Sequence, residues 1–218
     1  GTGANSTDEA IELSLEAKLI GADYVLLVTP YYNKPNQNGL LAHYEKIADN
    51  VNIKQILYNV PSRTACDLKP ETVSILSEHK NICGLKEAVD DIERIKELVK
   101  ISKNSSNFAI LSGDDPTFMN SLIEGAHGVI SVAANVIPKS ISEICKHIRE
   151  NNIAEAMKLN EVNNHLYRLL FVESNPIPVK WMLNKMKMIE NSIRLPLIEL
   201  DETYHDEILS ELNKLKLI

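Results

Sequence analysis

The chain has few cysteines, no long apolar run and no excess of basic residues, and each absence excludes a class of protein. Its 218 residues include three cysteines, set far apart in apolar surroundings. This odd number argues against both a disulfide framework and a zinc site. No apolar run is long enough to span a bilayer, and the first ten residues lack the basic flank and apolar centre of a signal peptide. We therefore expect a protein of the reducing cytoplasm that has no membrane partner.

The charge balance and the scattered histidines exclude two further kinds of partner. Against 30 acidic residues the chain has 23 Lys and Arg, for a net charge of −7. No basic stripe with interleaved aromatic residues is present to neutralise phosphates, so we expect no nucleic-acid partner. The six histidines lack metal-ligand spacing, and no metal site is predicted. A hydrophobic content of 44% is that of an ordinary globular protein with a sizeable core.

Five short apolar runs recur along the chain, each followed by a polar loop and then a helical pattern. Their starts lie roughly 20 to 30 residues apart, which is the period of a strand-plus-helix unit. This period predicts an α/β fold with parallel strands joined by right-handed crossovers. A glycine-rich phosphate loop is missing, which argues against a doubly wound nucleotide-binding sheet. The expected strands are 24–29, 55–59, 82–86, 108–112 and 128–133.

Strand patterns stop after Pro138, and the remaining sequence predicts helices. We divide the chain into a partial catalytic barrel, residues 1–150, and a C-terminal helical region, residues 151–218. A closed barrel of parallel strands and helices has about eight strands, whereas five are expected here. We therefore expect two or three leading strand-helix units to be absent before Gly1. The expected helices are 139–149, 154–171, 178–186 and 202–216.

A lysine at the end of an apolar strand is the clearest chemical signal. Lys86 follows the run 82–85, and Tyr58 closes the preceding strand, with Arg63 in the loop after it. A strand buried on both faces should bury the ammonium, which lowers its pKa, and a nearby arginine adds to this lowering. We expect neighbouring charge to make Tyr58 more acidic. A lysine that only snorkels at a strand end is the simpler interpretation.

The repeated polar strand ends favour a chemical role for Lys86 over snorkelling. The carboxyl ends of parallel strands converge on one rim, and unusual polar side chains follow each of the predicted strands. An amine of lowered pKa beside a phenol that passes protons can form a Schiff base with a carbonyl substrate.

Six segments, in the same order along the chain, resemble the dihydrodipicolinate synthase family. Together they are highly specific, although GLKEA alone would be weak. The resemblance implies a pyruvate-dependent class I aldolase on a (β/α)8 TIM barrel with a C-terminal helical region, acting without a cofactor in lysine and diaminopimelate biosynthesis. It also implies a homotetramer, a dimer of dimers. The segments are TPYYNKP (29–35), LYNVPSRT (57–64), GLKEA (84–88), LSGDD (111–115), GVISVAAN (128–135) and NPIPVKW (175–181).

The resemblance implies a role for each matching residue. Lys86 matches the lysine that forms the Schiff base with pyruvate, and Tyr58 matches the tyrosine that relays protons. Arg63 matches the arginine that holds the carboxylate of L-aspartate 4-semialdehyde. Tyr32 matches an aromatic residue that reaches across a subunit interface into this relay. The other matches are Gly113 and Ile130, which line the pyruvate pocket, and Asn5, Glu9 and Tyr31, which form part of the pocket where lysine inhibits some members.

The chain departs from the family pattern in three places. Ala65 stands where glycine is common, and Ser174 replaces a proline, both of which the fold should tolerate. The family's glycine-threonine-threonine-glycine-glutamate loop has no counterpart after Gly1. Two alternatives stay open: another pyruvate aldolase similar to N-acetylneuraminate lyase, which generally lacks an equivalent of Arg63, or a catalytically inactive truncated chain.

Overall fold

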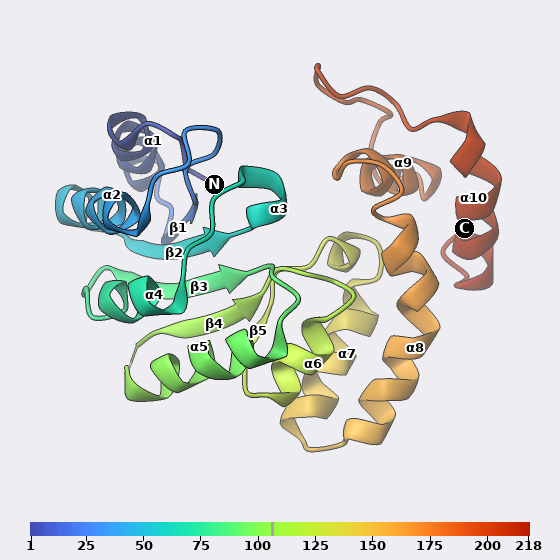
Figure 1. The fold of residues 1–218 in the computed structure, drawn as a ribbon. Helices are drawn as coiled ribbons and strands as arrows, with labels where there is room; N and C mark the ends of the chain where they lie inside the picture. The colour runs from blue at the N-terminus through green and yellow to red at the C-terminus, as the bar shows by residue number, and fades with distance from the viewer. Residues whose placement is uncertain (106) are drawn as a thin grey trace. The chain divides into compact units, whose positions relative to one another are not determined.

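The structure is a computed structural model that describes residues 1–105 and 107–218, and these fall into two compact units. The first unit, Gly1–Ile130, is built on a parallel sheet with the strand order β1-β2-β3-β4-β5 (Figure 1). Every neighbouring pair is parallel, which confirms the predicted α/β class. The strands are β1 (Tyr24–Val28), β2 (Lys54–Asn59), β3 (Ile82–Glu87), β4 (Ala109–Ser112) and β5 (Gly128–Val129).

The helices of this unit form a layer against the sheet. Because the strand order follows the sequence, right-handed crossovers place successive helices on the same face. Accordingly α1 packs on α2, α2 on α4, α4 on α5, and α5 on α6. The helices are α1 (Thr7–Leu19), α2 (Gln37–Asn50), α3 (Pro61–Thr64), α4 (Pro70–Leu76), α5 (Ile92–Asn104) and α6 (Phe118–Ile123).

The core of the first unit lies between the sheet and this helical layer. Burial alternates along β2, where Leu57 is buried and its neighbours Ile56 and Tyr58 are half-buried. Burial on both faces is predicted for β3, where Leu85 and Glu87 are buried and Lys86 is half-buried, so within the described residues the prediction is confirmed for the helix-facing side only. The buried apolar residues include Val25, Leu27, Leu40, Tyr44, Ile47, Leu57, Leu85, Leu98 and Ile110.

The fifth strand is shorter than its apolar sequence predicts. It spans Gly128–Val129, and a 3-10 helix, η1 (Ala133–Asn135), occupies the end of the expected run. The Ser131 hydroxyl accepts the Ala134 N–H at 2.8 Å, and the Val136 N–H bonds to the carbonyl of Ala133. These local bonds compete with a strand ladder and turn the chain.

The second unit, Ser131–Ile218, is helical. Within it α7 runs along α8, and α10 contacts α8 (Figure 1). The expected C-terminal helices are confirmed within a few residues at their ends, except that the last one is divided into η2 and α10. The domain division at residue 150 stays a prediction. The elements after η1 are α7 (Pro138–Arg149), α8 (Ile153–Leu169), α9 (Ile177–Lys185), η2 (Glu202–Tyr204) and α10 (His205–Lys214).

Helix-starting residues explain where several of these elements begin. Pro70 and Pro138 stand in the first turns of α4 and α7, where a missing N–H leaves no hydrogen bond unmade. The carboxylate of Asp91 accepts the N–H groups of Glu93 and Arg94 at 3.0 and 3.2 Å and so caps α5. Over the described residues, every helix is too short or too polar to cross a bilayer.

Replacing Leu57 by alanine should destabilise the first unit. The side chain is fully buried between the sheet and the helices, so its loss leaves a cavity and should lower the free energy of unfolding by about 2–5 kcal/mol. Urea unfolding measures this change. Leu19→Ala is the control, because that side chain is 84% exposed, and it should change the same free energy by less than about 0.5 kcal/mol. Equal effects of the two substitutions would contradict this description of the core.

Candidate active site

The carboxyl ends of β2 and β3 bring the lysine and the tyrosine together. In the parallel register Tyr58 lies opposite Lys86, and both side chains face away from the helices. The Lys86 Nζ atom lies 4.2 Å from the centre of the Tyr58 ring. The amine and the phenol are therefore close enough to act on one small substrate.

Gly113 lies directly against the lysine side chain. A Cβ atom at this position would be 2.7 Å from Cε and 3.1 Å from Cγ of Lys86, so no other residue fits without displacing the lysine. The Gly113 N–H donates to the carbonyl oxygen of Glu87 at 2.7 Å. Ile130 follows β5, where its N–H bonds to the carbonyl of Ser112 at 2.9 Å. Gly113 thus lies at the end of β4, next to β3, and Ile130 lies at the end of β5, one strand further along the sheet.

Arg63 is carried by the short helix α3, which starts directly after β2. The Thr64 hydroxyl fixes this turn, because it bonds to Thr29 Oγ1 at 3.1 Å and to the carbonyl of Val60 at 3.2 Å. Ala65 ends α3 with a left-handed φ of 55°. Glycine adopts this conformation without strain, which explains why it is the common residue there. The Arg63 side chain itself is exposed.

The surroundings of Lys86 favour its neutral form. Burial lowers the pKa of the amine, the negative charge of Asp115 raises it, and the positive charge of Arg63 lowers it again, with a net lowering. This agrees with the expectation from the sequence. A larger share of the amine is consequently unprotonated near neutral pH than for an exposed lysine.

Tyr58 differs from its expected behaviour. Burial raises the pKa of the phenol, and the charges of Asp114 and Glu87 raise it further, so the opposing effect of Arg63 does not make the group more acidic. The prediction of an acidified tyrosine is therefore wrong. The phenol keeps its proton near neutral pH, which suits it to donate that proton first.

The loop after β1 carries the two consecutive tyrosines. Tyr32 has a positive φ of 74° and is 88% exposed, and Tyr31 is 42% exposed. The side-chain amide of Asn33 donates to the carbonyl of Asn5 at 2.8 Å, which ties this loop to the start of α1. Glu9 lies in the exposed first turn of that helix. Asn5 and the tyrosine loop are thus neighbours, and Tyr32 lies at the surface of the chain.

A ring of polar side chains on the helix-facing side of the strand ends escaped the sequence analysis. The Asn59 amide donates to Glu87 at 3.0 Å and to Asp67 at 3.0 Å, and Arg94 Nε donates to Glu87 at 2.9 Å. The Arg94 guanidinium also binds Asp67 through both terminal nitrogens, at 3.2 and 2.9 Å. Asn59 and Glu87 directly follow Tyr58 and Lys86. Because side chains alternate along a strand, the sequence could have indicated that these two polar residues lie together on the face opposite the reactive pair.

Glu87 is the most enclosed member of this ring, with a side chain that is 0% exposed. Burial raises the pKa of its carboxyl, whereas Arg94 and the hydrogen bonds from Asn59 and the backbone lower it and limit the rise. One carboxylate oxygen also accepts the N–H groups of Ala88 and Val89 at 2.9 and 3.0 Å. These donors stabilise the ionised form and offset part of the cost of burying it.

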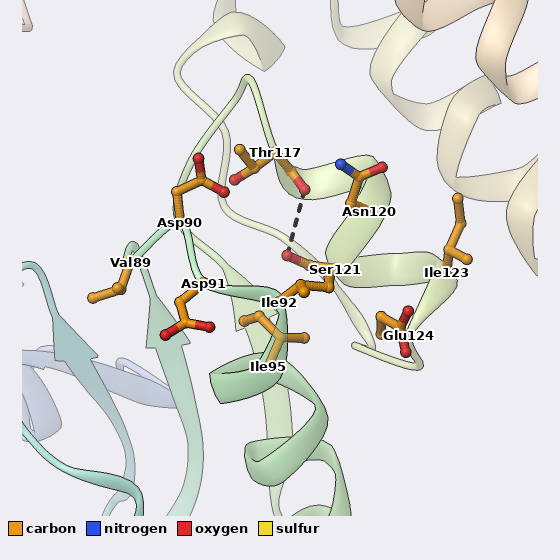
Figure 2. Close-up of a pocket in the computed structure, with 10 residues that line it drawn as sticks. All are labelled: Val89, Asp90, Asp91, Ile92, Ile95, Thr117, Asn120, Ser121, Ile123 and Glu124. Carbon is orange, nitrogen blue, oxygen red and sulfur yellow. Dashed lines mark hydrogen bonds between the residues drawn. The ribbon is translucent and has the colours of Figure 1, made fainter.

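A separate hollow of about 290 Å³ lies between the loop after β3 and α6 (Figure 2). Lys86 and Tyr58 do not line it. In the part of the chain that the structure describes, no group of three or more His, Cys, Asp or Glu side chains is arranged to hold a metal ion. The residues that line the hollow are Val89, Asp90, Asp91, Ile92, Ile95, Thr117, Asn120, Ser121, Ile123 and Glu124.

Comparison with known proteins identifies the family. The model of the Dihydrodipicolinate synthetase family matches residues 1–215. The chain belongs to this family. A 4-hydroxy-tetrahydrodipicolinate synthase of Coxiella burnetii is 50% identical over 98% of this chain and 72% of the relative. The synthase of Stutzerimonas stutzeri is 50% identical over 95% of this chain and 70% of the relative.

Solved structures of the dihydrodipicolinate synthetase family share the fold. The chloride-inhibited synthase from Acinetobacter baumannii, complexed with pyruvate, is 48% identical and superposes with a TM-score of 0.96 over 100% of this chain and 74% of that chain. The synthase from Thermotoga maritima is 40% identical, with a TM-score of 0.97 over 100% of this chain and 75% of that chain. The fold is therefore that of the family's TIM barrel, represented here by the described parallel strands.

Two substitutions should move the pKa of Lys86 in opposite directions. Asp115→Asn removes a charge that raises this pKa, so the pKa should fall, whereas Arg63→Met removes a charge that lowers it, so the pKa should rise. Competitive acylation across a pH series, followed by peptide mapping, gives the midpoint for Lys86. The peptide that contains the exposed Lys139 controls for reagent reactivity. Shifts of the same sign would contradict the described electrostatics.

Proposed function

We propose that this protein condenses pyruvate with L-aspartate 4-semialdehyde to give 4-hydroxy-tetrahydrodipicolinate, through a Schiff base on Lys86. The observation that carries the proposal is an amine of lowered pKa whose nitrogen lies 4.2 Å from the Tyr58 ring at the strand ends. The proposal is supported by relatives at 50% identity that are named for this synthase activity, and by the pyruvate complex of the similar synthase from A. baumannii.

The first stage joins pyruvate to the lysine. The neutral amine of Lys86 attacks the ketone carbon, and the ketone oxygen takes a proton from the Tyr58 hydroxyl. A second proton transfer lets this oxygen leave as water, which gives an iminium. The phenol begins protonated and can donate in the first transfer, and its raised pKa makes it a weaker acid but a stronger base for the proton transfers that follow. Gly113, whose lack of a side chain gives the lysine its space, lines the pyruvate pocket together with Ile130.

The second stage builds the new carbon-carbon bond. The iminium acidifies the methyl group of pyruvate, and loss of a methyl proton gives a nucleophilic enamine. The enamine carbon attacks the aldehyde carbon of the semialdehyde, whose oxygen becomes a hydroxyl by taking up a proton. The amino group of the bound semialdehyde then adds to the iminium carbon, and the Lys86 amine leaves as the ring closes. Tyr58 donates and accepts the protons of these steps.

Arg63 holds the carboxylate of the second substrate. Its guanidinium is a planar set of donors that matches a carboxylate in a way that the ammonium of lysine does not. Its exposed position on α3, directly after the strand of Tyr58, supports this role. An arginine at this position also favours the semialdehyde over the sugar-derived substrates of an aldolase similar to N-acetylneuraminate lyase.

The other predicted site residues have roles in subunit assembly and in inhibition by lysine. Tyr32 reaches a neighbouring subunit in a homotetramer, a role supported by its exposed ring and positive φ. One similar structure is described as a monomeric variant of the synthase, so related chains differ in assembly. Asn5, Glu9 and Tyr31 form part of a lysine pocket, and the similar synthase from Cyanidioschyzon merolae was solved with lysine bound. The catalytic part spans residues 1–150, and 151–218 is the helical region.

Lys86→Arg should abolish the covalent adduct with pyruvate while the protein stays folded. Arginine keeps the charge and much of the length of the side chain but cannot form the imine at ordinary pH. The measurement is intact mass after borohydride reduction of the full-length protein with pyruvate. Circular dichroism of the variant is the control for folding. An undiminished adduct on the variant would show that another amine performs the chemistry.

The choice of aldehyde should depend on Arg63. With pyruvate as donor, the wild-type full-length protein should consume L-aspartate 4-semialdehyde and not N-acetylmannosamine. Arg63→Met should lower kcat/KM for the semialdehyde by about 10- to 100-fold, because a charge-assisted pair with the carboxylate is lost. The pyruvate adduct on Lys86 should persist in this variant. Consumption of the sugar would favour the lyase alternative, and turnover of neither aldehyde would favour an inactive chain.

A further inference from the structure

We propose that Arg94 is a positioning residue for Lys86 and Tyr58, and that it acts from the opposite face of the sheet through the carboxylate of Glu87. This inference rests on the proposed function, since it assumes that Lys86 forms the imine. Arg94 lies in the first turn of α5, on the helical side of the sheet, so it does not itself face the substrate.

The connection runs through consecutive residues on two paired strands. Tyr58 pairs with Lys86, and the next pair in the same register is Asn59 with Glu87. Successive side chains of a strand point to opposite faces, so each reactive side chain is followed by a member of the polar ring on the other face. Whatever fixes Asn59 and Glu87 therefore fixes the backbone that carries Tyr58 and Lys86.

The polar ring closes on itself. Asn59 and Arg94 each donate to both carboxylates, those of Glu87 and Asp67, over distances of 2.9 to 3.2 Å. The side-chain oxygen of Asn59 accepts the Leu68 N–H at 2.9 Å. The ring thus joins the ends of β2 and β3, the loop after β2 and the start of α5.

Arginine is suited to this place and lysine is not. The guanidinium uses Nε for Glu87 and its terminal nitrogens for Asp67, a fork that a single ammonium cannot reproduce. Its side chain is 11% exposed and that of Glu87 is 0% exposed. Without Arg94 the two carboxylates would keep only neutral donors, the Asn59 amide between them and the Ala88 and Val89 N–H groups on Glu87. Their repulsion would loosen the contact between β3 and the loop after β2, which follows Asn59 directly.

Displacement of Glu87 would reach the reactive lysine from a second side. The Glu87 carbonyl oxygen accepts the Gly113 N–H at 2.7 Å, and Gly113 lies against the lysine side chain. The Ala88 N–H donates to the backbone carbonyl of Asn59 at 3.0 Å. A shift of Glu87 would therefore move both the backbone of Lys86 and the glycine against which its side chain rests.

The test follows imine formation in the full-length protein by rapid mixing with pyruvate, borohydride quench and intact mass. For Arg94→Met the maximal rate should fall on the order of 10- to 100-fold, because small displacements of reacting groups have effects of this size. The pyruvate concentration that gives half of the maximal rate should change by less than about twofold, because the groups that contact pyruvate remain. Arg94→Lys should give a rate between those of the wild type and Arg94→Met.

A double variant separates positioning from stability. Arg94→Met with Glu87→Gln removes both charges of the buried pair, so its urea midpoint should recover toward the wild type while imine formation stays slow. Lys96→Met is the matched control, because it removes a 2.7 Å ion pair with Glu93 on the exposed side of the same helix. It should change neither the midpoint nor the rate.

Each remaining outcome overturns one of the two proposals. Imine formation at the wild-type rate in Arg94→Met, or in Arg94→Lys if the former does not fold, would overturn the positioning role. If both the midpoint and the rate recovered in the double variant, Arg94 would serve only to compensate the charge of Glu87. This result would also overturn the positioning role. A wild-type protein that forms no adduct on Lys86 would overturn the proposed function, and the positioning role with it.

Discussion

The pairing of β2 with β3 is the constraint on which the site depends. Their parallel register sets Tyr58 opposite Lys86 and Asn59 opposite Glu87, so a single ladder of backbone hydrogen bonds locates four side chains. Because side chains alternate along a strand, slipping this register by one residue would exchange the reactive pair with the polar pair. Packing against the helices opposes such a slip. Leu57 and Leu85, which directly precede Tyr58 and Lys86, are fully buried, and a slip would turn them out of the core.

The two faces of the sheet carry different groups: Lys86 and Tyr58 lie on one face, and the polar ring lies on the other. On one face burial lowers the pKa of an amine, and on the other an arginine and several N–H donors oppose the rise that burial causes in the pKa of a carboxyl. Buried ion pairs often add little to stability, because the desolvation of both charges offsets their attraction. What the ring of Asn59, Asp67, Glu87 and Arg94 supplies is geometry, since each bond in it has a direction as well as a strength.

Sequence patterns predicted the parallel strands and the helices well, because the apolar period and the positions of proline are local signals. They located Lys86 and Tyr58 at strand ends for the same reason. The polar ring could not be predicted in this way. It depends on Asp67 and Arg94, which are far apart in the sequence, lying close together in the fold, and no local pattern contains that information. The pKa of Tyr58 depended on burial and on two carboxylates brought close by folding. The end of β5 was decided by the hydroxyl of Ser131, whose bond to the backbone competes with an apolar sequence that favours a strand.

The contact of Gly113 with the lysine side chain limits which substitutions the chain tolerates beside Lys86. Any side chain at this position would press on the aliphatic part of Lys86, so a substitution of Gly113 would displace the amine before it changed anything else. Arg63 is less constrained, because it lies on a single helical turn that ends in the left-handed Ala65 and its side chain is exposed. Under the proposed function, new preferences for the second substrate are consequently to be sought in the residues after β2.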